Sequence, residues 1–285
     1  MAIYDYKQEE FSFIKAMNKM TLINGFTPVI QPKAYLLGGQ SGAGKTMLHL
    51  LATNETEDNL VIIDGDTFRK GHPSSDLITN KYGKEDVKYT AKFAGQMVEE
   101  LMEELSEAKF NLLIEGTLRT VDVPLKTVHL LNQKGYKTEL LVMAVHPILS
   151  YLGTISRYEE AYAITPELAR ATPKEHHDLI VEKLPENLDT LYKLDVFSTI
   201  RLFNRSGATL YNQQDTPEKS PKQIMAAIIE SNLTEEETDM AMTVIKRTNE
   251  LIEQRDKNNS ETQFIINELK RLAEIVVQQR TIKGT

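Results

Sequence analysis

The stretch Gly39-Gln40-Ser41-Gly42-Ala43-Gly44-Lys45-Thr46 matches the pattern G-x-x-x-x-G-K-[ST]. The apolar residues 34–37 before it predict a buried strand, and residues 47–51 after it predict the start of a helix. A strand, this loop and a helix, in that order, form the setting that a phosphate-binding P-loop requires. The stretch therefore predicts an α/β fold with a nucleotide site.

The residue types in this loop suit the phosphates of a nucleotide. Its glycines let the backbone turn tightly, so that successive N–H groups of residues 39–46 point at phosphate oxygens. The N-terminus of the following helix adds its dipole. Lys45 supplies a positive charge for the β- and γ-phosphates, and the Thr46 hydroxyl is the expected ligand of Mg²⁺. We therefore expect ATP and Mg²⁺ at this site.

The rest of the core alternates between strands and helices. Strands are predicted over residues 60–63, 111–114 and 138–145, and helices over residues 6–20, 87–108 and from Pro124 to Gly135. The apolar runs are continuous rather than alternating, which is typical of a parallel sheet covered by helices on both faces. Residues 200–204 and 208–211 predict a terminal hairpin. The expected architecture is a P-loop kinase-like α/β fold.

Capping patterns predict further helices towards the C-terminus. Starts are expected at Thr165-Pro166-Glu167, at Thr172-Pro173-Lys174-Glu175, and at two capping boxes, Thr234–Glu237 and Ser260–Gln263. Residues 215–222 are rich in proline, serine and charge and predict a linker. We expect a P-loop kinase domain over residues 1–215, including the N-terminal helix, and a helical appendage over residues 223–285.

Composition places the chain among ordinary globular proteins. It has 285 residues, 41% of them hydrophobic and 26% charged, and a net charge of −8. The acidic balance argues against nucleic acid or an anionic membrane as the main partner. The absence of cysteine excludes disulfides, a thiolate nucleophile and cysteine zinc sites. Since neither a signal-peptide core nor a membrane-length apolar run is present, we expect a cytoplasmic protein.

Two carboxylates, Asp64 and Asp66, follow the second expected strand. At the end of a parallel strand both can project into the edge of the sheet where ligands bind. One can support Mg²⁺ and its waters, and the other can accept a proton from an attacking hydroxyl. A solvated turn would use the same residue types. Beside a P-loop, the pair favours a kinase that acts on a hydroxylated small molecule.

A second polar cluster, Glu115, Thr117 and Arg119, follows the next expected strand. Its side chains suit recognition of hydroxyl and phosphate groups, although a helix cap with a surface arginine is the alternative. Further along, Arg157 and Arg170 flank a short segment that contains Pro166 and is expected to be helical. If this segment forms a mobile lid, its arginines could close over ATP and stabilise charge on the transferred phosphoryl group.

Other P-loop classes fit the sequence less well. A GTPase would carry Asn-Lys-x-Asp after a strand, whereas residues 132–135 read Asn-Gln-Lys-Gly. A motor ATPase would usually have a glutamate directly after the strand-end aspartate, where this chain has Gly65. The adjacent histidines His176 and His177 would point to different helix faces, so they make a poor metal pair and are expected at the surface or in a cap.

Five segments, in this order, resemble the zeta toxin family of epsilon/zeta toxin–antitoxin systems. They read LLGGQSGAGKT, VIIDGDTFRKGHP, NLLIEGTLRTVDVP, YLGTISRYEEAY and ARATPKEHHD, starting at residues 36, 61, 111, 151 and 169. The resemblance covers about residues 1–215, and the tail carries much less of it. It implies an ATP- and Mg²⁺-dependent kinase that phosphorylates the 3′-hydroxyl of the aminosugar of UDP-N-acetylglucosamine and so blocks peptidoglycan precursor synthesis.

The resemblance also implies roles for individual residues. Lys45 and Thr46 would handle phosphates and Mg²⁺, and Asp66 would be the base facing the sugar hydroxyl. Arg157 and Arg170 would clamp the ATP phosphates. The sugar-nucleotide pocket would be lined by Asp66, Glu99, Glu115, Thr117, Arg119 and Thr127. A small helical antitoxin would block the ATP cleft, in a heterotetramer of two toxins and two antitoxins.

Two other functions stay open at this stage. The first is a P-loop phosphotransferase for another small hydroxylated acceptor, such as an antibiotic or a nucleoside. The second is a non-catalytic nucleotide-binding module whose helical tail carries the function. The residues themselves indicate a kinase of a small hydroxylated molecule, and only the resemblance names the sugar nucleotide.

Overall fold

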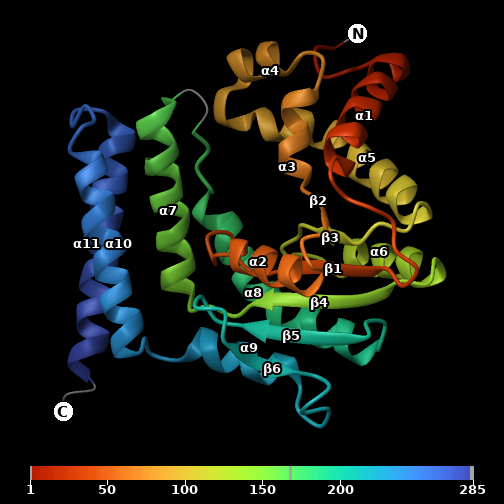
Figure 1. The fold of residues 1–285 in the computed structure, drawn as a ribbon. Helices are drawn as coiled ribbons and strands as arrows, with labels where there is room; N and C mark the ends of the chain where they lie inside the picture. Colours follow the sequence, from red (N-terminus) through yellow and green to blue (C-terminus); the bar gives the residue numbers. More distant parts are fainter. Residues whose placement is uncertain (1, 167–168, 283–285) are drawn as a thin grey trace.

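Six strands form one sheet in the spatial order β2-β3-β1-β4-β5-β6. The computed structural model describes residues 2–166 and 169–282. The first five strands run parallel, and β6 pairs antiparallel with β5 (Figure 1). The expected α/β fold, parallel sheet and terminal hairpin are confirmed. The strands are β1 (Lys33–Gly38), β2 (Val61–Ile63), β3 (Leu112–Ile114), β4 (Lys137–Met143), β5 (Thr199–Phe203) and β6 (Thr209–Asn212).

Helices connect the strands and cover the sheet. Two short 3₁₀ turns, η1 (Arg69–Gly71) and η2 (Gly83–Glu85), lie beside α4. The helices are α1 (Gln8–Ile23), α2 (Thr46–Glu55), α3 (Gly65–Phe68), α4 (Ser75–Tyr82), α5 (Asp86–Glu107), α6 (Asp122–Gln133), α7 (Pro147–Ile164), α8 (Lys174–Lys193), α9 (Pro221–Glu230), α10 (Glu235–Ile252) and α11 (Ser260–Ile282).

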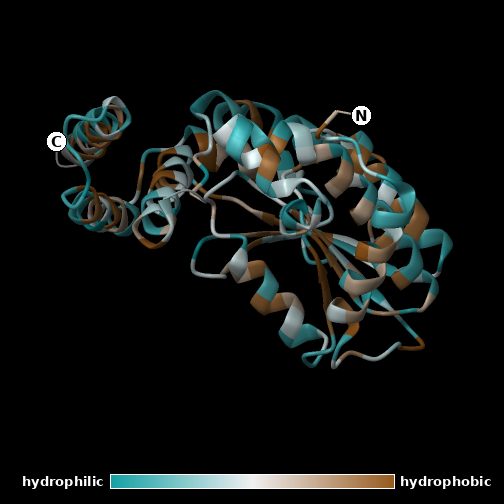
Figure 2. Cartoon of the chain, turned by 90° about the horizontal axis from the view of Figure 1, so that it is seen from above, coloured by the Kyte–Doolittle hydropathy of each residue, from teal (hydrophilic) through white to brown (hydrophobic). Residues whose placement is uncertain are grey.

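The sheet is buried on both faces, which is why its strands are apolar throughout (Figure 2). In β1, Ala34 and Leu36 face one core, to which α1, α5, α6, α8 and α9 contribute. Tyr35 and Leu37 face the other core, to which α2, α7, α10 and α11 contribute. The central position of β1, between β3 and β4, places the loop that follows it in the middle of the carboxyl edge.

The C-terminal helices join the two cores in different ways. Helix α9 packs on α8 and adds Met225 to the first core. Helices α10 and α11 form an antiparallel pair beside α7, at the periphery of the molecule (Figure 1). We call this pair, with the turn between its helices, the C-terminal hairpin (residues 235–282). No helix in the described part of the chain combines the length and the apolar character needed to cross a membrane.

The caps of the C-terminal helices agree only in part with the predicted helix starts. The box at Thr234 is confirmed, since its hydroxyl accepts from the Glu237 N–H at 3.1 Å. The second box is displaced by one residue, because Asn259 accepts from the Glu261 N–H at 2.8 Å and Ser260 already lies inside α11. The Ser220 hydroxyl caps α9, so that helix begins within the expected linker.

The two proline-led starts have different outcomes. The first falls on a segment that the structure describes only in part: Thr165 is the C-terminal cap residue of α7, and Glu167 lies outside the described residues. Helix α8 begins at Lys174 with Pro173 in the cap position and no side-chain cap. Thr172 lies one residue before this cap, and its hydroxyl accepts a hydrogen bond from Arg157 at 3.3 Å.

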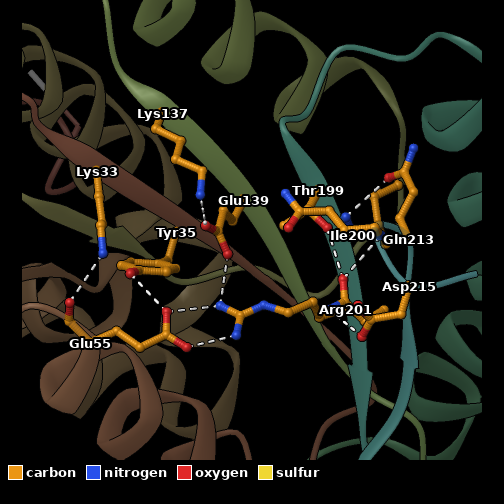
Figure 3. Close-up of polar contacts among 12 residues, drawn as sticks. Lys33, Tyr35, Glu55, Lys137, Glu139, Thr199, Ile200, Arg201, Gln213 and Asp215 are labelled. Carbon is orange, nitrogen blue, oxygen red and sulfur yellow. Dashed lines mark hydrogen bonds and ion pairs between the residues drawn. The ribbon is translucent and has the colours of Figure 1, made fainter. Parts of the chain in front are cut away.

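A polar network links α2 to three strands near their amino ends (Figure 3). Arg201 on β5 donates to both carboxylate oxygens of Glu55 at 2.6 and 2.9 Å, and to Glu139 on β4 at 2.7 Å. The Tyr35 hydroxyl on β1 donates to Glu55 at 3.0 Å. The side chains of Arg201 and Glu139 are only 14% and 7% exposed. Arg201 therefore neutralises two carboxylates in a largely buried position.

Replacing Arg201 by methionine should lower the free energy of unfolding by about 3–5 kcal/mol, because two partly buried carboxylates lose their partner. Urea unfolding followed by circular dichroism measures the loss. The matched control is Lys137→Met, because Lys137 contacts the same Glu139 at 3.2 Å but is 52% exposed. An exposed pair is worth no more than about 1 kcal/mol. Equal losses in the two variants would contradict the role of Arg201.

The loss in Arg201→Met should also depend on pH. Burial pushes the pKa of Glu55 upward, but the hydrogen bonds and charge of Arg201 outweigh it and hold that pKa below its usual range. A lowered folded-state pKa adds stability above the unfolded pKa of about 4.3, and this stability disappears as the pH falls through the folded value. The difference between wild type and Arg201→Met should therefore shrink below about pH 4.3. A difference independent of pH would contradict this.

Candidate active site at the carboxyl edge of the sheet

The P-loop has the backbone geometry that its glycines predict. Gly39, Gly42 and Gly44 have φ angles of +124°, +75° and +91°, in the region that residues with a side chain rarely adopt. The Gln40 side chain points inward, where its amide donates to the Val145 carbonyl at 2.9 Å. The loop is therefore anchored to the end of β4, and its turn leaves backbone N–H groups for a ligand.

The P-loop also rests against α7 at van der Waals distance. A Cβ atom on Gly153 would lie 2.3 Å from the Gly42 carbonyl oxygen, and one on Gly42 would lie 2.1 Å from the Ser150 carbonyl oxygen. From the turn after β5, Arg205 donates to the same Gly42 carbonyl at 2.7 Å. Burial lowers the pKa of Arg205. Helix α7 and Arg205 thus hold the loop from two sides.

Gly153→Ala should weaken nucleotide binding by about tenfold or more, because its methyl group would push α7 and the P-loop apart. Titration with a fluorescent ATP analogue measures the dissociation constant. The control is Gly95→Ala on α5, where nothing lies within 4 Å of the added methyl group. That variant should bind like wild type and be slightly more stable, since alanine is the better helix former. Unchanged binding in Gly153→Ala would refute the argument.

Charged groups from the segment after β2, the end of β3 and α7 act on Lys45, which is half-buried at the start of α2. Burial lowers the pKa of Lys45, and Glu115 at the end of β3 opposes this by its charge. Arg157 on α7 lowers that pKa further, and Asp64 and Asp66 raise it. The structure therefore brings together five of the groups that the sequence singled out.

The two carboxylates after β2 have different surroundings. The Asp64 carboxylate caps α3 by accepting from the Asp66 N–H at 2.9 Å, and burial raises its pKa. The Asp66 side chain is 76% exposed, and Arg69 donates to one of its oxygens at 2.7 Å. Asp64 thus orients the turn, while Asp66 presents a carboxylate outward at the sheet edge.

Glu115 is held by a residue that the sequence analysis did not single out. His49 on α2 contacts the Glu115 carboxylate through Nε2 at 2.5 Å. Beyond it, Thr117 is half-buried and Leu118 has a φ angle of +57°. The Leu118 side chain lies against Gly38, where a Cβ atom would be 2.4 Å away. This contact packs the loop after β3 against the strand that carries the P-loop.

Three further residues were predicted to line the site. Glu99 on α5 pairs with Lys126 on α6 at 3.0 Å, and both side chains are exposed. The next residue on α6, Thr127, is buried. Arg119 is exposed, and its charge helps lower the pKa of His176, after the larger effect of burial.

The two arginines of the expected clamp have different partners. Arg157 is exposed on α7 and donates to Thr172 at 3.3 Å. Arg170, in the segment between α7 and α8, donates to Asp86 at 3.0 Å. Asp86 begins α5 and its side chain is only 3% exposed, so the segment is tied across to α5. Of the two, Arg157 is the one whose charge acts on Lys45 among the larger effects there.

Some of the site's supporting residues carried a signal in the sequence, and others did not. His49 lies four residues after Lys45 and so shares its helix face, which the spacing could have shown. Arg205 and Asp86 act on residues far away in the chain, so no local pattern marks them. His177, expected at the surface or in a cap, is buried because α8 packs on α7, and it hydrogen-bonds to Ser150 at 2.8 Å.

Comparison with known proteins identifies the relatives of this site. A family model described as Zeta toxin matches residues 19–216. The chain belongs to the zeta toxin family. The resemblance seen in the sequence is thereby confirmed. This zeta-family chain is 46% identical over 253 residues to Toxin PezT of Streptococcus pneumoniae serotype 4, covering 89% of the chain and 100% of that relative. It is also 46% identical to Toxin zeta of Streptococcus pyogenes, over 78% of each chain.

Solved structures agree with the zeta-family assignment. A structure from work on the PezAT chromosomal toxin–antitoxin system of Streptococcus pneumoniae superposes with a TM-score of 0.83 at 42% identity, over 89% of this chain and 100% of that one. The AvrRxo1-ORF1:-ORF2 complex with ATP superposes with a TM-score of 0.50 at 13% identity, over 95% of this chain and 88% of that one. The second likeness shows a shared P-loop kinase-like fold.

Proposed function

We propose that this protein transfers the γ-phosphoryl group of ATP to the 3′-hydroxyl of the aminosugar of UDP-N-acetylglucosamine. The observation that carries the proposal is the set of charged groups around Lys45, contributed by the segment after β2, by β3 and by α7. A binding module needs the P-loop alone, whereas a carboxylate and an arginine near its lysine are what phosphoryl transfer requires. Zeta-family membership supports the choice of acceptor.

On the nucleotide side, the N–H groups of residues 39–46 would bind the phosphates, with Lys45 at the β- and γ-phosphates. No group of three or more His, Cys, Asp or Glu in the part of the chain that the structure describes could hold a metal by itself. This fits Mg²⁺, which takes one or two protein ligands and completes its shell with phosphates and water. The exposed Thr46 hydroxyl and the Asp64 carboxylate would hold it. When bound, the ion neutralises phosphate charge.

On the acceptor side, Asp66 would take the proton of the attacking hydroxyl. A bond forms between the sugar oxygen and the γ-phosphorus, the bond to the β-phosphate oxygen breaks, and ADP leaves. Glu115, Thr117, Arg119, Glu99 and Thr127 would position the sugar nucleotide. Val98, next to Glu99, lies against Gly65, the residue between the two aspartates. A Cβ atom on Gly65 would be 3.3 Å from the Val98 side chain. This contact brings α5 close to the acceptor side of the proposed site.

Arg157 and Arg170 would neutralise the transferring phosphoryl group. Arg157 already lies in the charge environment of Lys45, whereas Arg170 would reach the phosphates from its position at Asp86. A guanidinium has five N–H donors, so one bond to Asp86 leaves others for phosphate oxygens.

We further propose that the chain acts as the toxin of a toxin–antitoxin pair, and that phosphorylated UDP-N-acetylglucosamine blocks peptidoglycan precursor synthesis. Support comes from the solved relative, whose structure belongs to work on a toxin–antitoxin system. The partner would be a small helical antitoxin that blocks the ATP cleft, in a heterotetramer of two chains of each kind. We also propose a cytoplasmic location, where both substrates would be found.

ADP release measured with a panel of acceptors tests the proposal. Release should require UDP-N-acetylglucosamine and should be at background with nucleosides, aminoglycosides or water. Release with a different acceptor would favour the alternative of another small-molecule phosphotransferase. Tight ATP binding without release on any acceptor would favour a non-catalytic module.

A further inference from the structure

We propose that Arg255 is a positioning residue for Arg157, and that the C-terminal hairpin acts on the active site through it. This inference rests on the proposed function, because Arg157 is taken to stabilise the transferring phosphoryl group. It assigns a role to the segment that the sequence analysis described only as a helical appendage.

Arg255 lies in the turn between α10 and α11 and reaches into α7. Its Nη1 donates to Glu159 at 2.6 Å, and the two side chains are only 4% and 1% exposed. Its guanidinium lies over the Tyr162 ring, 3.7 Å from the ring centre. A buried, stacked ion pair of this kind joins two elements in one defined geometry. Arg255 thus holds α7 at positions 159 and 162.

A second contact lies on the same face of α7. The Tyr158 hydroxyl donates to Glu261, in the first turn of α11, at 2.8 Å. Arg157 precedes these residues directly, but it is exposed on another side of the helix and bonds Thr172. The turn of α7 that presents Arg157 is therefore held from behind by the hairpin.

The opposite side of α7 is held by the P-loop. Gly153, one turn before Arg157, lies so close to the Gly42 carbonyl that a Cβ atom there would be 2.3 Å away. Helix α7 is thus enclosed between the nucleotide loop and the C-terminal hairpin. Loss of Arg255 removes the buried ion pair from the hairpin support and leaves the contact of Tyr158 with Glu261, so the turn that presents Arg157 to Lys45 is held less firmly.

The hairpin supports the segment after Arg170 much less. Residues 171–175 and Phe264, Ile265 and Glu268 on α11 line a pocket of about 280 Å³ between them. Arg170 is instead anchored by Asp86 on α5. The effect of Arg255 should therefore reach Arg157 through α7 and leave Arg170 unaffected.

Kinetic double-mutant cycles test this selectivity. Arg255→Met should lower kcat about tenfold and change the KM for UDP-N-acetylglucosamine less than about threefold, because only transition-state stabilisation is lost. In an Arg157→Ala background the same change should lower kcat less than about twofold, whereas in Arg170→Ala it should keep its full effect. Equal effects in both backgrounds would show a merely structural role and overturn the proposal.

The matched control is Arg247→Met, which breaks another ion pair between α10 and α7. Arg247 contacts Glu160 at 3.1 Å, but the side chains are 68% and 41% exposed. Since exposed pairs contribute little, kcat should change less than about twofold. The paired variant Arg255→Met/Glu159→Met avoids leaving a buried charge, so it should fold and still show the kcat defect. Wild-type kcat in that variant would overturn the proposal.

Hydrogen–deuterium exchange provides a readout that needs no catalysis. Amides of residues 151–162 should exchange faster in Arg255→Met than in wild type, while those of β1 and β4 stay unchanged. Unchanged exchange in α7 would overturn the positioning role. If wild type transferred no phosphoryl group to the sugar nucleotide, the proposed function would fail while the exchange result still decided whether Arg255 holds α7.

Discussion

Lys45→Met should reduce phosphoryl transfer by about 10³-fold, the upper range for losing one preorganised charge at a reacting group. Burial lowers the pKa of Lys45 even though three carboxylates act to raise it. A cation desolvated in this way gains most when phosphate oxygens arrive. Methionine keeps the length and apolar stem of the side chain, so the loop geometry should be kept and only the charge removed.

ADP release with UDP-N-acetylglucosamine at saturating ATP measures this effect. The control is Lys92→Met on α5, which removes an equal charge at an exposed position and should leave the rate unchanged. Urea unfolding of both variants checks that the fold is kept. If Lys45→Met retained more than about a tenth of the rate, the loop would not serve transfer as proposed.

Asp66→Asn should reduce transfer by about 10²–10⁴-fold, the usual contribution of a general base. The change removes the proton acceptor but keeps the size of the side chain and its hydrogen bond from Arg69. Because Asp66 is 76% exposed, the free energy of unfolding should hardly change. ATP affinity should stay near the wild-type value, since the lost group faces the acceptor.

Asp64→Asn is the matched control for Asp66. An asparagine still accepts the Asp66 N–H, so the cap of α3 is kept. We expect a smaller loss of rate that higher Mg²⁺ concentrations restore in part. The opposite ranking, with Asp64→Asn inactive and Asp66→Asn nearly active, would exchange the roles of the two carboxylates.

Local patterns in the sequence were sufficient for much of the fold and for the centre of the site. The P-loop is read from eight consecutive residues, and the buried strands from short apolar runs. Strand ends in a parallel sheet share an edge, which is why Asp64, Glu115 and Lys45 were expected together. All three do share one electrostatic environment.

The errors arose where neighbouring residues could serve the same purpose. Asn259 and Ser260 can both cap a helix, and only packing decides that Asn259 does so. Thr172 was expected to cap α8, but Pro173 occupies the cap position and the Thr172 hydroxyl accepts a hydrogen bond from Arg157 instead. Residues 220–221 were included in a linker, yet Ser220 and Pro221 are suitable helix-start residues and begin α9.

Long-range partners could not be predicted at all. Arg205 meets Gly42, Arg170 meets Asp86, and Arg255 meets Glu159 across 163, 84 and 96 residues of sequence. Such pairs follow from the tertiary arrangement of α7, α5 and the C-terminal hairpin rather than from any spacing. The first two contacts involve the P-loop and Arg170, which were predicted to bind phosphate, and the third is the one proposed to position Arg157.

The most direct test of the account is to identify the product formed from ATP and UDP-N-acetylglucosamine. Mass spectrometry of the purified reaction should show the sugar nucleotide with one added phosphoryl group, and phosphorus–proton NMR should couple that group to the proton at the 3′ position of the aminosugar. Asp66→Asn should form none of it. An unmodified sugar nucleotide after complete turnover of ATP, or a phosphoryl group on another atom, would contradict the proposed reaction.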